Sequence, residues 1–300
     1  MEIKLKIRRY NPETGQLIWE EASVPFHQDL TVMEALDYLN DHKQKQISFR
    51  HSCRMGICGS CGAVVNNEHV LMCQTFCRDL KQPIVIEPIK NFPVIKDLVV
   101  DIKNGMEKFR TALPYTKIQS NHTSEKSGYK HLLQSPTQRK KIEQSSQCIK
   151  CMLCYSACPI FAFNQNFIGP AAAALADRYN KDNRDHLKES RFREITKDEG
   201  IYKCSFIGEC SKVCPKSVDP SGTLQKLKIA GVFKSPRKSI PQKNKGPNLN
   251  KNRNTIGGQR KILTGFILSA KSTASSWACS LSFSPCSHLS TTTSQHPRPS

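Results

Sequence analysis

The spacing of the cysteines constrains this chain more than any other feature of its sequence. Eleven of the fourteen cysteines fall into three runs, and the first run reads Cys-x4-Cys-x2-Cys-x11-Cys. Plant-type [2Fe-2S] sites have this spacing, whereas structural zinc sites usually pair their ligands in short knuckles. The first run therefore predicts a [2Fe-2S] cluster on Cys53, Cys58, Cys61 and Cys73. The nearby Cys77 is expected to be a buried apolar thiol rather than a ligand.

The second and third runs have to be interpreted together. They read Cys-x2-Cys-x2-Cys-x3-Cys-Pro and Cys-x5-Cys-x3-Cys-Pro. In two-cluster ferredoxins the last cysteine of such a run ligates the other cluster. This predicts one [4Fe-4S] cluster on Cys148, Cys151, Cys154 and Cys214, and leaves Cys158, Cys204 and Cys210 for another. Ile207 stands where a fourth thiol would be needed, so we expect [3Fe-4S]. The alternative is a second [4Fe-4S] cluster completed by water or another side chain.

The positive charge is concentrated near the C-terminus. The formal net charge is +20, but 13 of the 45 Lys and Arg residues, and no Asp or Glu, lie between Pro220 and Ser300. The first 219 residues therefore carry a net charge of only +7. A basic segment can bind nucleic acid or anionic lipid. The abundance of Pro, Asn, Lys, Ser and Thr instead predicts a disordered tail over residues 236–300.

The sequence shows neither an export signal nor a membrane span. It opens MEIKLKIRRYN, which alternates like a strand and lacks the apolar stretch of a signal peptide. We therefore expect a reducing, intracellular compartment, in which thiolates hold iron rather than form disulfides. No segment approaches the roughly 18 consecutive apolar residues of a transmembrane helix. Any membrane association would come through partner proteins.

Apolar patterning predicts an α+β chain of two domains followed by the tail. Residues 1–105 alternate in short apolar segments around one helix, and residues 106–235 carry helical patterns only. The expected strands lie at residues 3–7, 17–24, 63–65 and 83–88. The expected helices run from Thr31 through Leu39, over residues 93–110 as a connection, from Pro170 through Asn180, from Leu187 to Ile195, and from Pro220 through Ile229.

These residues closely resemble the iron–sulfur subunit of bacterial quinol:fumarate reductase and its sibling in succinate dehydrogenase. The similar segments are SCRMGICGSCGAVVNN (52–67), CIKCMLCYSACP (148–159), FIGPAAAALADRYNKDNRDH (167–186) and CSFIGECSKVCPKSVDP (204–220). The resemblance covers about residues 1–230. It implies an N-terminal β-grasp (plant-type ferredoxin-like) domain, an all-α helical ferredoxin domain, and one [2Fe-2S], one [4Fe-4S] and one [3Fe-4S] cluster. The tail departs from the family, and its composition favours a shifted reading frame or a fused non-coding stretch over a functional extension.

The resemblance also implies a function and partners. The chain would relay electrons between a flavoprotein catalytic subunit, which alone carries FAD, and the membrane quinone, menaquinone or ubiquinone. Anchor subunits would hold it peripherally at the cytoplasmic face of the inner membrane, and no nucleic acid would be involved. The positions that line the family's quinone pocket are Phe206, Gln225 and Lys228. Phe163 and Cys61 stand where some members carry Trp and Asp, which favours the fumarate reductase branch.

Two other functions stay open on the sequence. The chain could be the iron–sulfur subunit of a related flavin dehydrogenase with another acceptor, and co-purification of a flavoprotein with covalent FAD would separate the two. It could also be a zinc-binding nucleic-acid protein, which would be colourless and would bind DNA or RNA.

Overall fold

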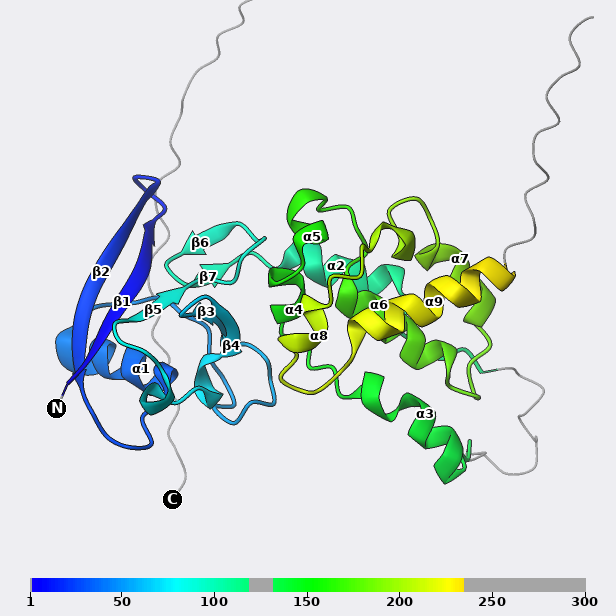
Figure 1. The fold of residues 1–300 in the computed structure, drawn as a ribbon, viewed down its shortest axis with the longest axis horizontal. Helices are drawn as coiled ribbons and strands as arrows, with labels where there is room; N and C mark the ends of the chain where they lie inside the picture. The colour runs from blue at the N-terminus through cyan, green and yellow to red at the C-terminus, as the bar shows by residue number, and fades with distance from the viewer. Residues whose placement is uncertain (1, 119–131, 235–300) are drawn as a thin grey trace, which may run out of the picture. The chain divides into compact units, whose positions relative to one another are not determined.

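The N-terminal half of the chain is built on one mixed sheet (Figure 1). The computed structural model describes residues 2–118 and 132–234, so the predicted disordered tail lies outside the described residues. The sheet has the strand order β2-β1-β5-β3-β4. Only the β1–β5 pair is parallel, and the other three pairs are antiparallel. The strands are β1 (Glu2–Asn11), β2 (Gln16–Pro25), β3 (Gly62–Val65), β4 (Glu68–Leu71) and β5 (Ile84–Glu87).

One helix completes the core of this half. In β1 the alternating side chains of Ile3, Leu5 and Ile7 are buried, as the sequence pattern predicts. Helix α1 (Val32–Lys43) starts at Thr31, whose hydroxyl accepts from the backbone N–H of Glu34 while the Glu34 carboxylate accepts from the Thr31 N–H. This capping box satisfies two N–H groups that the helix itself leaves without partners. The predicted strands and the predicted helix are confirmed.

The predicted helical connection over residues 93–110 is wrong for its first part. Residues 94–100 form a hairpin of β6 (Val94–Lys96) and β7 (Val99–Val100), and only then does α2 (Lys103–Thr111) begin. The turn between the strands is held by Asp97, which has a φ of 48°. Its buried carboxylate accepts from Arg9 Nε at 2.8 Å and from the Ser48 N–H at 2.9 Å. These distant partners override the local helical spacing.

The second half, from residue 132 to residue 234, contains helices and no strand among its described residues. The alanine-rich α6 lies at its centre and packs against α3, α7 and α9. The predicted helices α6, α7 and α9 are confirmed, whereas α3, α4, α5 and α8 were not predicted. Four- and five-residue segments such as α4, α5 and α8 are too short to show a period. The helices are α3 (Pro136–Ser146), α4 (Leu153–Ser156), α5 (Pro159–Phe163), α6 (Pro170–Asn180), α7 (Lys188–Ile195), α8 (Glu209–Lys212) and α9 (Pro220–Lys234).

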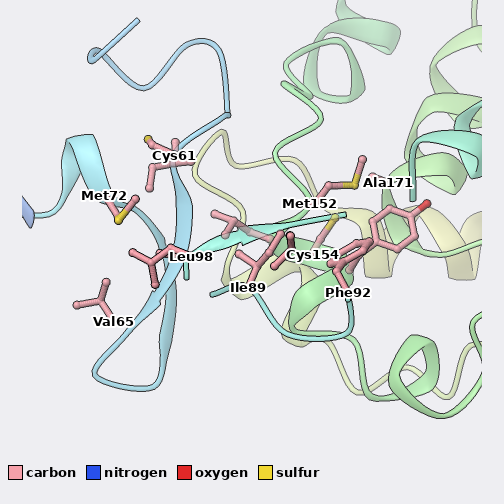
Figure 2. Close-up of a cluster of buried hydrophobic side chains, with 14 of the residues drawn as sticks. Cys61, Val65, Met72, Ile89, Phe92, Leu98, Met152, Cys154 and Ala171 are labelled. Carbon is pink, nitrogen blue, oxygen red and sulfur yellow. The ribbon is translucent and has the colours of Figure 1, made fainter. Parts of the chain in front are cut away.

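A continuous apolar core joins the two halves. Ile89, Phe92 and Leu98 from the N-terminal half gather beside Met152 and Cys154 of the helical half (Figure 2). Next to them, the Asn91 side-chain amide lies within 3.2 Å of the carbonyl oxygens of Tyr155, Ser156 and Cys158. Because the apolar and polar contacts occur together, the loop after β5 is attached directly to α4, which carries Cys154, and to Cys158 just before α5.

Candidate metal centres

Four thiols gather around the loop that connects α1 to β3. Cys61 and Cys73 are buried, with their sulfur atoms 3.3 Å apart. The Cys53 sulfur accepts from the backbone N–H groups of Ile57 at 3.3 Å and Cys58 at 3.2 Å. N–H groups that point at sulfur stabilise thiolate and help to set the potential of an iron–sulfur cluster. The loop therefore offers three sulfurs and a set of donors to a cluster, and the short helical turn after β4 brings Cys73 as the fourth sulfur.

The thiols of this loop have very different proton affinities. The Ser60 hydroxyl, 3.1 Å from the Cys58 sulfur, and nearby backbone N–H groups lower the pKa of Cys58 to about 6. Burial, together with the neighbouring Cys73, raises the pKa of Cys61 to about 12. Bound metal supplies the positive charge that deprotonates such a thiol. Cys77 is buried in the apolar core and its pKa is raised to about 11 by burial, so its predicted character as a buried apolar thiol is confirmed.

A second group of four thiols lines one cavity in the helical half. Its walls include Cys148, Cys151, Cys154 and Cys214. The first two lie on the loop before α4, Cys154 lies within α4, and Cys214 follows α8. Burial raises the pKa of Cys154 well above its usual value, and the nearby thiols raise it further. Lys150 and Met152 have φ angles of 57° and 66°, which side-chain-bearing residues seldom adopt. This backbone turns the loop around the cavity.

The remaining three thiols of the predicted sites line a separate cavity between the loop before α5 and the loop before α8. Burial raises the pKa of Cys210 to about 12, with the thiols of Cys158 and Cys204 as further causes. Backbone N–H groups of Phe161 and Phe206 donate to the sulfurs of Cys158 and Cys204, each at 3.4 Å. The wall of this cavity carries Ile207 at the position where a fourth thiol would complete the pattern.

The eleven thiols thus lie in groups of four, four and three. Within residues 2–118 and 132–234, no group of three or more His, Cys, Asp or Glu side chains is arranged to hold a single metal ion. The second and third groups each line a small cavity, and the first group gathers around its loop. Sulfur ligands with backbone donors beside them suit iron–sulfur clusters. The metal that each group holds stays a prediction.

The three residues predicted to line a quinone pocket lie near the third group. Phe206 is exposed and forms part of the cavity wall beside Cys204. On α9, the Lys228 ammonium donates to the Cys204 carbonyl oxygen at 2.5 Å. The Gln225 Nε2 is buried and has no hydrogen-bond partner among the described residues. Lys228 is therefore attached to the cysteine loop rather than solvated on a helix surface.

Two hydroxyl groups next to the cysteines were not predicted as site residues. Ser60 lies 3.1 Å from the Cys58 sulfur. The Ser211 hydroxyl helps to lower the pKa of Cys210, against the stronger effect of burial, and donates to Asp219 Oδ1 at 2.6 Å. Their only signal in the sequence is a serine within two positions of a cysteine, which is too common to identify them.

Comparison with known proteins gives matches over both halves. The family described as "2Fe-2S iron-sulfur cluster binding domain" matches residues 4–107, and the "4Fe-4S dicluster domain" matches residues 144–218. The fumarate reductase iron-sulfur subunit of Escherichia coli O157:H7 is 42% identical over 76% of this chain and 92% of its own length. That of Mycobacterium tuberculosis is 41% identical over 79% and 96%, respectively.

More distant matches extend the comparison. The succinate dehydrogenase iron-sulfur subunit of Coxiella burnetii is 32% identical over 74% of this chain and 94% of its own length. A chain of the Mycobacterium smegmatis Sdh1 complex in the apo form has a TM-score of 0.69 at 22% identity, covering 80% of this chain and 99% of that one. The structural match supports the order of a mixed-sheet domain followed by a helical domain.

Proposed function

Because the chain belongs to the family of iron–sulfur subunits of fumarate reductases and succinate dehydrogenases, we propose that its three thiol groups hold the clusters that relay electrons in such an oxidoreductase. Cys53, Cys58, Cys61 and Cys73 would hold [2Fe-2S], Cys148, Cys151, Cys154 and Cys214 [4Fe-4S], and Cys158, Cys204 and Cys210 [3Fe-4S]. The observation that carries this proposal is the grouping of seven cysteines from two distant runs into one cavity of four and one of three. We take residues 1–105 and 106–235 as the two domains.

The clusters would supply one-electron carriers, and the chain's own residues would tune and shield them. Backbone N–H groups and the Ser60 hydroxyl stabilise sulfur-borne negative charge at the first site. Burial of Cys154 and Cys210 keeps water away from the other two sites. Burial away from water disfavours the more negatively charged, reduced state of a cluster, whereas hydrogen-bond donors to sulfur favour it. Burial and donors together would therefore set the order of the three reduction potentials.

The flavoprotein subunit would dock against the first cysteine loop. Cys58 is exposed there, and the two large apolar side chains of the same loop, Met55 and Ile57, are about 60% exposed. Exposed apolar residues grouped around a functional loop are typical of a protein–protein contact. A partner seated here would exclude water from the most accessible thiol of the chain.

Membrane anchor subunits and quinone would meet the opposite end of the relay, at the third site. No helix of the described residues is long and apolar enough to cross a membrane. Large apolar side chains are exposed on the wall of the third site, at the end of α5 and along α9, namely Phe206, Ile207, Phe163, Ile229, Val232 and Phe233. We infer that this surface contacts the anchors at the cytoplasmic face of the inner membrane. The free Gln225 N–H and the Lys228 ammonium could donate to the quinone oxygens.

Metal analysis of the anaerobically purified protein tests this proposal. We expect about nine irons per chain, the sum for the three cluster types, and an electron paramagnetic resonance signal of oxidised [3Fe-4S]. Cys210→Ala should abolish that signal, whereas Cys77→Ala, which removes a buried thiol outside the three groups, should keep the iron content. Stoichiometric zinc without iron would contradict the proposal and favour the nucleic-acid alternative. A co-purifying flavoprotein without succinate or fumarate activity would favour the other dehydrogenase.

A further inference from the structure

The first cysteine loop touches the second at a glycine. Gly59 lies between the ligand positions Cys58 and Cys61, and its φ of 74° is in the left-handed region. A Cβ at this position would lie 2.9 Å from the Cys151 Cβ and 2.9 Å from the Ile149 carbonyl oxygen. Carbon atoms in contact normally stay about 3.5–4.0 Å apart. The two loops therefore approach so closely that only a hydrogen atom fits between them.

The atoms that Gly59 meets cannot easily move aside. They belong to the backbone and to the Cβ of Cys151, rather than to the end of a flexible side chain. The loop that carries them is held in an unusual conformation, since Lys150 and Met152 on either side of Cys151 both have positive φ. Gly62, the next glycine along the first loop, differs in this respect. Its Cβ would meet the terminal Cδ2 of Leu153 at 3.1 Å and the Cys151 carbonyl oxygen only at 3.4 Å, so a side chain there would displace the second loop less than one at Gly59.

We propose that Gly59 is a positioning residue that sets the separation of the first and second metal sites. The inference rests on the proposed function, because it concerns the passage of one electron between these sites. In that step one site is oxidised and the other reduced by one electron, and no atom or bond is transferred. Electronic coupling between redox centres falls exponentially with their separation. An added methyl group would push the loops apart by about 0.6 Å or more to restore normal contact, and would so weaken the coupling.

The test compares Gly59→Ala with two other glycine variants in the full chain, loaded with iron and assembled with its flavoprotein. Gly15→Ala is the matched control, because Gly15 has a φ of 67° and nothing within 4 Å of its Cβ position. It reports the cost of a side chain at positive φ without any contact between sites. The first measurement is the magnetic interaction between the two reduced clusters by electron paramagnetic resonance. The second is the rate at which the second site is reduced after reduction through the flavoprotein.

We expect Gly59→Ala to weaken the magnetic interaction and to slow reduction of the second site several-fold, at unchanged iron content and cluster potentials. Gly15→Ala should match wild type. Wild-type interaction and rate in an iron-replete Gly59→Ala would overturn the inference and leave the proposed function intact. If wild type itself lacks either cluster, the proposed function fails instead. If Gly59→Ala does not retain iron, Gly62→Ala decides: a smaller weakening of both quantities supports the inference, and wild-type values overturn it.

Discussion

Arg191 carries a fully buried charge, and its removal should destabilise the segment that follows α2. Its Nη1 lies 2.7 Å from Asp185 Oδ2, and both side chains are inaccessible to solvent. The other guanidinium nitrogens donate, at 2.9–3.2 Å, to the carbonyl oxygens of the chain that leaves α2, those of Ala112, Leu113 and Tyr115. One side chain therefore satisfies both a buried carboxylate and the backbone of the connecting segment.

Arg191→Met keeps much of the apolar volume and removes every donor. Breaking a buried ion pair by removing one partner costs about 3–5 kcal/mol, because the remaining charge is left uncompensated. Asp185 would still accept a hydrogen bond from the Lys117 backbone N–H at 3.0 Å. This single hydrogen bond replaces the lost ion pair only in part. A loss of this size is a large share of the roughly 5–15 kcal/mol that stabilises a natural protein. The matched control is Lys197→Met, whose exposed pair with Glu194 is worth at most about 1 kcal/mol.

Hydrogen exchange of the intact, iron-loaded protein measures this loss without requiring reversible unfolding. A loss of about 3 kcal/mol or more corresponds to exchange roughly a hundred-fold faster, at about 1.4 kcal/mol for each factor of ten. We expect this acceleration in peptides that cover residues 105–118, whereas the peptides of β1 and β2 should be little affected. Unchanged exchange over residues 105–118 in Arg191→Met would refute the reasoning, as would an equal effect of Lys197→Met.

Three further changes test the sites. Ile207→Cys places a thiol on the wall of the third cavity, so the oxidised [3Fe-4S] signal should disappear as a fourth iron binds; its persistence would contradict the assignment. Lys228→Leu should lower the rate of quinol-linked fumarate reduction about ten-fold, which is about 1.4 kcal/mol of transition-state stabilisation, and should leave the dye-linked rate unchanged. The control is Lys226→Leu, at an exposed position of the same helix. Equal loss in both assays would indicate a structural role for Lys228. Ser60→Ala removes a hydrogen-bond donor to Cys58 and should lower the reduction potential of the first site by about 20–60 mV. We expect the lower end of this range, because solvent screens the exposed pair. Spectroelectrochemistry that shows no decrease would argue against this role of Ser60.

Much of the fold could be predicted because its signals are local. Each of these signals depends on residues that are close together in the sequence. Examples are the alternation in β1, the capping box at Thr31, and the proline and alanines that start α6. The hairpin at residues 94–100 could not be predicted in this way. Its turn depends on hydrogen bonds from Arg9 and Ser48 to Asp97, and these residues are far away in the sequence.

The sequence by itself determined the number and kind of ligands, since cysteine spacing is a property of the chain and matches the short loops that wrap a cluster. Only the tertiary structure decided what surrounds those ligands. It attaches Lys228 to the Cys204 carbonyl oxygen and places Gly59 against Cys151. These contacts join elements that are distant in sequence, and they depend on how helices and loops pack. Spacing along the chain carries no information about such packing, because side chains from separate elements meet only when the core closes.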